Sequence, residues 1–136
     1  AFAESCTGGY ISHLITSVPG SSEYLKGSIV AYSNEVKMKE LGVRSETLEQ
    51  FGAVSEETAI EMAEGVRKNL GSDIGFSSTG IAGPTGGTEE KPVGTIWLAF
   101  SSKDKTKTIK LNLAGTRELN IKHTAINALN LIRLSL

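Results

Sequence analysis

The stretch from Ser55 to Thr79 restricts the possible folds more than any other part of the chain. Ser55 and the two glutamates after it are typical of a helix start, because a serine oxygen accepts free N–H groups and acidic side chains suit the positive end of the helix dipole. The helical spacing ends at Gly71, and Ile74 to Thr79 then has the pattern of a buried strand. This order predicts an α/β fold. The apolar face of the helix consists of Ala59, Ile60, Met62, Ala63, Val66 and Leu70.

The rest of the chain continues this alternation. Its late strands form a predicted hairpin, so we expect a three-layer α/β/α domain with a mixed sheet covered by helices on both faces. Ala1 to Ala3 are expected to be the end of a strand that starts outside this sequence. The last helix is expected to turn Leu119, Ala125, Ile126, Leu129 and Ile132 inward. Further helices are predicted at Gly8–Ser17, from a cap at Ser33–Asn34 to Leu41–Gly42, and at Arg117–Leu134, and strands at Ile29–Tyr32, Val93–Phe100 and Thr106–Leu113.

Size and composition indicate one folded domain over residues 1–136. The length is typical of a single core, and 39% hydrophobic against 21% charged residues, without charge-rich blocks, argues against disorder. No apolar run approaches the roughly 20 residues of a membrane span, and no signal-peptide pattern is present. We therefore expect no contact with membranes.

Charge and cysteine content exclude further classes. The net charge is -1 and the basic residues are scattered, whereas a nucleic-acid site needs a basic stripe, so no nucleic-acid partner is expected. Cys6 has no disulfide partner, and His13 and His123 lack companion cysteines for zinc, so we expect a metal-free, cytoplasmic protein that uses no cofactor. Both histidines are expected to be solvated or to pack between helices.

Ligands of open α/β sheets bind beyond the carboxyl ends of the strands, so the polar junctions between strands and helices are candidate sites. Four junctions qualify: Ser5–Gly9, Tyr32–Lys37, Thr79–Gly87 and Ala114–Arg117.

At the first junction, Ser5 precedes a glycine pair at a helix start, where free N–H groups could hold an oxyanion or a phosphate. A plain helix N-cap is the alternative for Ser5. Cys6 is a stronger intrinsic nucleophile but has no evident base, and a small core residue is the expected role.

At the second junction, Lys37 lies near the start of a helix capped by Asn34, where the dipole would lower its pKa. Ser5, Tyr32 and Lys37 could then supply nucleophile, proton relay and base. The alternative is a solvated lysine and a packed tyrosine.

The two remaining junctions suit an anion. The loop from Gly80 to Gly87 brings backbone amides close to a ligand but matches neither a dinucleotide fingerprint nor a P-loop, and it could be a structural turn. Arg117 at a helix start is electrostatically misplaced unless an anion accompanies it, so phosphate binding and a solvated position both stay open.

Several segments in one order closely resemble the CinA C-terminal domain family of bacteria, over nearly the whole chain. That family is identified as nicotinamide mononucleotide deamidase, and its other name refers to competence and DNA damage. The segments are Glu4-Ser5-Cys6-Thr7-Gly8-Gly9, Val18-Pro19-Gly20-Ser21-Ser22, Ala31-Tyr32-Ser33-Asn34 with Lys37, Gly52-Ala53-Val54-Ser55, Thr79-Gly80-Ile81-Ala82-Gly83-Pro84 and Lys91-Pro92-Val93-Gly94-Thr95.

The resemblance implies hydrolysis of the carboxamide of nicotinamide mononucleotide to nicotinic acid mononucleotide and ammonia, a step of pyridine nucleotide salvage, and it favours a homodimer. The family's catalytic serine, tyrosine and lysine match Ser5, Tyr32 and Lys37. Thr116 stands where the family often has an acidic residue. The residues expected to contact substrate are Cys6, Thr7, Gly8, Asn34, Thr79, Gly80, Gly83 and Arg117.

Two other functions fit the same fold. One is a binding module that captures a mononucleotide without turning it over, and the other is an interaction domain of a competence-related protein. The joint presence of Ser5, Tyr32 and Lys37 favours the enzyme.

Overall fold

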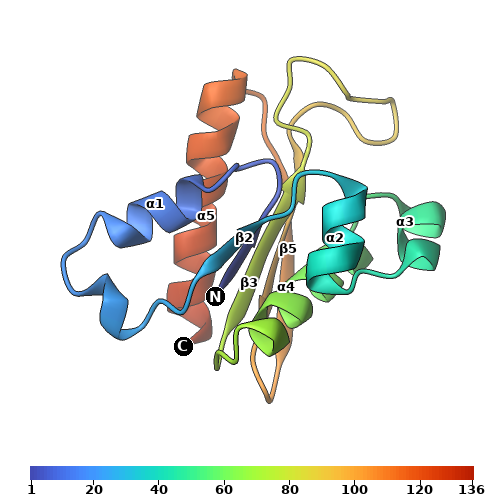
Figure 1. Cartoon of the computed structure of the whole chain (residues 1–136). Helices are drawn as coiled ribbons and strands as arrows, with labels where there is room; N and C mark the ends of the chain where they lie inside the picture. Colours follow the sequence, from blue (N-terminus) through green and yellow to red (C-terminus); the bar gives the residue numbers. More distant parts are fainter.

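A computed structural model of the protein describes residues 1–136 throughout. A single five-stranded sheet forms its centre, with helices on either side (Figure 1). The elements in chain order are β1 (Phe2–Glu4), α1 (Tyr10–Thr16), the 3-10 helix η1 (Ser21–Glu23), β2 (Ser28–Val30), α2 (Asn34–Leu41), α3 (Ser45–Phe51), α4 (Glu56–Asn69), β3 (Gly75–Gly80), β4 (Thr95–Ser101), β5 (Thr106–Asn112) and α5 (Arg117–Ser135).

The sheet is mixed, in the order β2-β1-β3-β4-β5. Strand β1 pairs in parallel with β2 and with β3, while β4 runs antiparallel to both β3 and β5. The carboxyl ends of β1, β2 and β3 therefore lie at one edge of the sheet, together with the start of β4. This edge is where chain segments far apart in sequence meet.

Helices cover both faces, which confirms the predicted three-layer architecture (Figure 1). On one face, α1 and α5 pack against Ile96, Leu98 and Phe100 of β4 through an apolar core. On the other face, α4 lies directly on the sheet. Its approach is so close that a Cβ added at Gly75 would lie 2.0 Å from the carbonyl oxygen of Ala63, so only glycine fits there. More than half of the buried residues on this second face are alanines, and the full set is Ala3, Ala31, Ala59, Ala63, Ala99, Leu41, Val43, Met62 and Val66.

Some boundaries differ from the predicted ones. Strand β2 ends at Val30, two residues before Tyr32, and α1 begins at Tyr10 rather than Gly8. The cap of α2 is Ser33, whose oxygen accepts from Val36 N, and Asn34 is already helical. Helix α3 was not predicted at all.

Two residues of α5 point the other way from the prediction. Leu119 and Ile126 are exposed, whereas the polar residues Asn120 and Thr124 are fully buried. Asn120 and Thr124 can be buried because their amide and hydroxyl groups make hydrogen bonds inside the protein. The spacing of apolar residues alone therefore does not mark the buried face of this helix.

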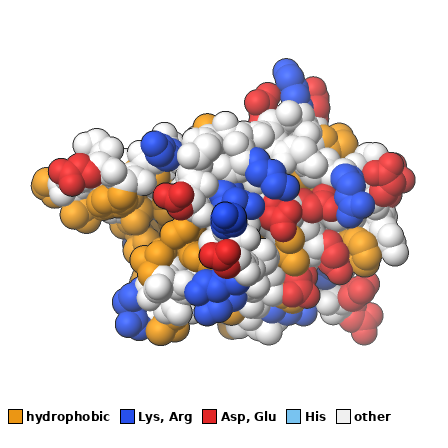
Figure 2. Space-filling model, turned by 90° about the horizontal axis from the view of Figure 1, so that it is seen from below, with side chains coloured by type: hydrophobic (Ala, Val, Ile, Leu, Met, Phe, Trp, Pro, Cys, Tyr) orange, Lys and Arg blue, Asp and Glu red, His pale blue; other side chains and the backbone are white.

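The surface opposite the edge where β1, β2 and β3 end carries an apolar hollow of about 460 Å³, and Figure 2 shows hydrophobic side chains gathered toward one side of the molecule. The hollow is lined by Ala1, Phe2, Ile15, Tyr24, Leu25, Ile74, Phe76, Leu129, Ile132, Arg133 and Leu136.

No helix of the structure combines the length and apolarity needed to cross a bilayer.

Candidate active site

The carboxyl edge of the sheet brings Ser5 and Lys37 into contact. Ser5 follows β1 directly, and Lys37 lies on α2, which leaves the sheet after β2. The Lys37 Nζ donates a hydrogen bond of 3.1 Å to the Ser5 Oγ. Both side chains are buried. A hydroxyl and an amine from two parallel strand ends thus form a contact that a nucleophile and its base require.

Lys37 is enclosed by acceptors that carry no charge. Its Nζ also donates to the carbonyl oxygens of Ala31, at 2.9 Å, and Tyr32, at 3.2 Å, and no carboxylate forms an ion pair with it. Burial lowers the pKa of the Lys37 amine, because the charged form loses water without gaining an anion. A lowered pKa was expected here from the helix dipole. With Ser33 as the cap, however, Lys37 is the fourth helical residue, and burial is the main cause of its lowered pKa.

Ser5 is not a helix cap. The cap position of α1 belongs to Gly9, which has a φ of 98° and provides no side chain. The backbone of Ser5 is fixed instead by its N–H, which donates to the Ser78 carbonyl at 2.9 Å, and by its carbonyl, which accepts from Gly8 N at 3.0 Å. The hydroxyl is therefore free of any capping role and faces Lys37.

Glu4 is a buried residue of this site that sequence reasoning missed. Its carboxylate is inaccessible to solvent and accepts bonds from Gly9 N at 3.1 Å, Ile11 N at 3.0 Å and Ser12 N at 2.8 Å, as well as from two hydroxyls. The first turn of α1 is thus already bound to an anion from its own chain. The N–H groups of Gly9, Ile11 and Ser12 are therefore not free to hold a phosphate or oxyanion, which leaves that role at this junction to the N–H of Cys6.

Cys6, Thr7 and Gly8 differ in their access to the site. Burial raises the pKa of the Cys6 thiol to about 12, so it stays neutral and packs in the core, although it also borders the cavity. The Thr7 hydroxyl is hydrogen-bonded to Glu4 and to Ser78 at 2.7 Å each. Neither Thr7 nor Gly8 lines the cavity with the others, but the N–H groups of Cys6 and Thr7 donate to no acceptor in the chain.

The cavity beside Ser5 has a volume of about 270 Å³. It contains nine of the residues expected to act on or bind substrate, from all four polar junctions of the sequence. The lining is Ser5, Cys6, Tyr32, Asn34, Lys37, Ala53, Val54, Thr79, Gly80, Ile81, Ala82, Gly83, Thr85, Gly86 and Arg117.

Arg117 joins two sides of the cavity. It donates from Nη2 to the Tyr32 hydroxyl at 3.0 Å and from Nη1 to the Gly83 carbonyl at 2.6 Å. The Tyr32 hydroxyl therefore lies beside Arg117 and not between Ser5 and Lys37, whose contact is direct. An arginine held by two neutral acceptors keeps its full charge at the rim of the cavity.

Thr79, a buried residue near the end of β3, lines the cavity. Its hydroxyl donates to the carbonyl of Ala53 at 2.7 Å, which fixes the segment between α3 and α4 against the sheet. His13 and His123 are exposed and lie outside the cavity. No three residues among His, Cys, Asp and Glu come together as metal ligands would.

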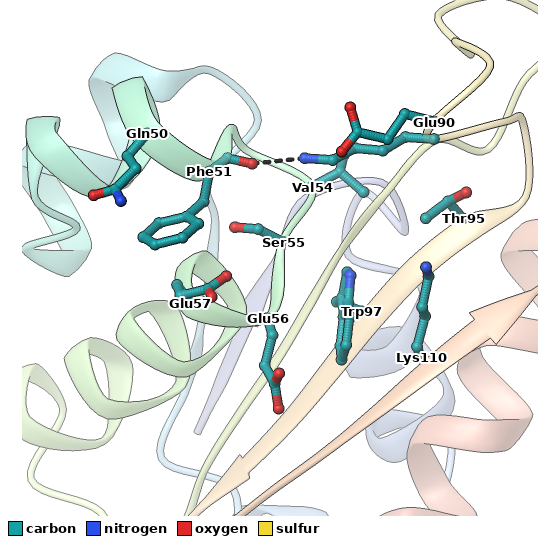
Figure 3. A pocket seen from close by; sticks show the side chains of 11 residues that line it. Gln50, Phe51, Val54, Ser55, Glu56, Glu57, Glu90, Thr95, Trp97 and Lys110 are labelled. Atoms are coloured by element: carbon teal, nitrogen blue, oxygen red, sulfur yellow. Dashed lines mark hydrogen bonds between the residues drawn. The ribbon is translucent and has the colours of Figure 1, made fainter.

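A second hollow of about 380 Å³ adjoins the first and shares Val54 with it (Figure 3). Trp97 and Lys110 form one wall, with the Lys110 Nζ 5.9 Å from the centre of the indole ring, and Phe51 stands opposite. Lys91, which also lines the hollow, donates from its Nζ to the Phe51 carbonyl at 2.6 Å. None of the predicted site residues lines this hollow.

Comparison with known proteins matches the whole chain, residues 1–136, to the CinA C-terminal domain. A CinA-like protein of Cytophaga hutchinsonii is 58% identical over 133 residues, which make up 98% of this chain and 32% of that protein, and one of Endomicrobium trichonymphae is also 58% identical over 133 residues, 98% of this chain and 31% of that protein. The chain thus spans about a third of the length of these curated relatives.

Solved structures agree. The competence/damage inducible protein CihA of Agrobacterium tumefaciens superimposes with a TM-score of 0.96 at 39% identity, covering 99% of this chain and 84% of that one. A competence-damaged protein (CinA) superfamily protein of Escherichia coli gives 0.95 at 32% identity, covering 99% and 78%. This chain belongs to the CinA C-terminal domain family.

Proposed function

We propose that this protein hydrolyses the carboxamide of nicotinamide mononucleotide to nicotinic acid mononucleotide and ammonia through an ester on Ser5. The observation that carries the proposal is the 3.1 Å hydrogen bond from Lys37 Nζ to Ser5 Oγ inside a cavity. The choice of substrate rests on the family resemblance. The chemistry rests on the serine and lysine themselves.

Lys37 is suited to act as the base because its surroundings direct its lone pair. A neutral amine has two N–H groups, and the carbonyls of Ala31 and Tyr32 can accept both. The lone pair then points along the remaining contact, toward the Ser5 hydroxyl. Burial lowers the pKa of Lys37 and so enlarges the neutral fraction that this role needs.

The reaction proceeds by two additions. As the Ser5 Oγ bonds to the amide carbon, its proton passes to Lys37, and the N–H group of Cys6 or the backbone at Gly80, both of which line the cavity, stabilises the oxyanion. The protonated Lys37 returns the proton to the leaving nitrogen, and ammonia departs. Water then attacks the ester carbon and gives a proton to Lys37. As the ester C–O bond breaks, Lys37 returns that proton to the Ser5 Oγ, which releases the carboxylic acid product and restores the free Ser5 hydroxyl.

Arg117 and the glycine loop are suited to the phosphate of the substrate. The arginine carries a full positive charge at the rim, and the N–H groups of Ala82 and Gly83 donate to no acceptor in the chain. Tyr32 lines the same cavity as Ser5, and its hydroxyl accepts from Arg117 Nη2, so this hydroxyl is a second candidate for the proton donor to the leaving nitrogen. No metal ion or cofactor has a role in this scheme.

The test is ammonia release from nicotinamide mononucleotide by the parent protein, Ser5→Ala and Ser102→Ala. Ser102 lies in the β4–β5 turn, away from the cavity, and serves as the matched control. We expect turnover by the parent and the control, none by Ser5→Ala, and retained substrate binding by all three. Parental rates in Ser5→Ala would contradict the ester mechanism. Binding without ammonia release by the parent protein would indicate a binding module.

A further inference from the structure

Asn120 is a fully buried amide on the first turn of α5, and all of its side-chain bonds go to the backbone of two residues: Ala82, which lines the cavity, and Gly115, which lies two residues before Arg117. Its Nδ2 donates to the carbonyl of Ala82 at 3.0 Å and to that of Gly115 at 3.1 Å. Its Oδ1 accepts from Gly115 N at 3.0 Å. One side chain thus ties two segments that are far apart in the sequence.

These two segments carry the groups that face the ligand cavity. Ala82 precedes Gly83, whose carbonyl accepts from Arg117 Nη1, and Gly115 lies two residues before Arg117. Asn120 and Arg117 therefore link the same two segments: Asn120 through Ala82 and Gly115, and Arg117 through Gly83. Displacing either segment would move the guanidinium relative to the glycine loop.

We propose that Asn120 is a positioning residue of the reaction: it fixes Arg117 and the Ala82–Gly83 backbone at the spacing that receives the substrate's anionic group. The inference rests on the function proposed above. A buried amide must find acceptors for its two N–H groups, and those of Asn120 belong to the two segments that carry Gly83 and Arg117 rather than to its own helix. Thr124, equally buried one turn later, shows the contrast, since its hydroxyl donates within the helix to the Asn120 carbonyl.

The experiment compares Asn120→Asp with Thr124→Val. Aspartate has the same shape and can still accept from Gly115 N, but it has no N–H for the two carbonyls. Thr124→Val also removes a buried hydrogen bond, without touching the rim. We expect Asn120→Asp to raise the KM for nicotinamide mononucleotide by about tenfold or more at little change in kcat, and Thr124→Val to leave both near parental values.

A double-mutant cycle separates positioning from general destabilisation. If Asn120 acts through Arg117, then Asn120→Asp combined with Arg117→Ala should lose no more than about threefold in kcat/KM beyond Arg117→Ala alone. Independent, multiplying losses would overturn the proposal, as would equal effects of Asn120→Asp and Thr124→Val. Asn120→Ser, which keeps one hydroxyl donor, replaces the aspartate variant if that variant does not fold.

Amide hydrogen exchange keeps this inference distinct from the proposed function. Should the parent protein release no ammonia, the proposed function fails, and exchange is then compared between the parent and Asn120→Ser. Exchange about tenfold faster at Ala82–Gly86 and Gly115–Arg117, with β4 unchanged, supports the positioning role. Unchanged exchange in both segments overturns it.

Discussion

The Nζ of Lys37 and the Oγ of Ser5 lie 3.1 Å apart although the residues are 32 positions apart in the chain. The contact exists because β1 and β2 are parallel neighbours, so the residues that follow them emerge at the same edge. The amine has no carboxylate partner there, and its protonation state therefore responds to pH in a way that the proposed activity would reveal.

We expect kcat/KM for amide hydrolysis to rise with pH as Lys37 loses its proton. Only the neutral amine can accept the Ser5 proton, and because burial lowers the pKa of Lys37, the midpoint should lie below the ordinary value of 10.5. The profile is measured by ammonia release across pH, with circular dichroism at each point to show that the protein stays folded. If kcat/KM does not change with pH between neutral and alkaline pH, Lys37 is not the base.

The free energy of unfolding should also increase with pH in the alkaline range. The folded pKa of Lys37 is lowered, so between that value and 10.5 the unfolded chain binds more protons, and raising the pH favours the folded state. Below the folded pKa the penalty of a buried charge is fully present. Urea titrations of the parent and Lys37→Met over this window test the difference. If the free energy of unfolding changes with pH equally in the parent and in Lys37→Met, burial does not lower the pKa of Lys37.

The architecture could be predicted from the sequence because its main elements carry their own periodic signal. The helix after Ser55 has small apolar residues at helical spacing, and Ile74 to Thr79 is uniformly strand-like. Helix α3 has no such signal, since Ser45–Phe51 is mostly polar and is anchored by Thr47 and Arg44, which both donate to Glu61 of α4. A helix stabilised by a distant carboxylate has no local pattern to reveal it.

Some residues of the site could be predicted from the sequence and others could not. Ser5, Tyr32 and Lys37 could be singled out because they stand at strand-to-helix junctions, where open α/β sheets bind ligands, and because a serine, a tyrosine and a lysine together have recognisable chemistry. Glu4 and Asn120 could not, because their partners are backbone groups of other segments, which a sequence does not bring together. Glutamate at the end of a strand usually indicates a solvated side chain, whereas here it is buried.

Replacing Glu4 with glutamine should destabilise the protein by about 2 kcal/mol, because an amide has one acceptor oxygen for donors that the carboxylate now satisfies with two. The loss is measured as a lower urea midpoint. Glu118→Gln is the control: it removes an exposed ion pair with Lys122 near the start of α5, and because exposed ion pairs contribute little to stability, the midpoint should shift far less than in Glu4→Gln. If both variants have the parental midpoint, the Glu4 contacts are not important for folding.

Gly75→Ala should cost about 2 kcal/mol or more, since the new Cβ would lie 2.0 Å from the Ala63 carbonyl and would force α4 away from the sheet. Gly20→Ala provides the comparison. Nothing lies within 4 Å of a Cβ there, so only the strain of its φ of 89° remains, about 1 kcal/mol. Thermal unfolding of the two variants measures the difference, and a smaller loss for Gly75→Ala would contradict the close packing of α4 on β3.

Tyr32→Phe distinguishes two roles for the tyrosine hydroxyl. The hydroxyl accepts from Arg117 Nη2, whereas Lys37 reaches Ser5 directly, so we expect the variant still to form the Ser5 ester, but at a lower rate because ammonia is expelled more slowly or because substrate binds less well. A loss of about tenfold in kcat/KM fits a supporting proton donor or a positioning contact. Arg117→Lys, which keeps the charge but not the paired donors, is measured alongside it. A loss of activity in Tyr32→Phe as complete as that in Ser5→Ala would instead make Tyr32 an obligatory proton relay. The Ser5 proton would then reach Lys37 through Tyr32 and not through the direct contact.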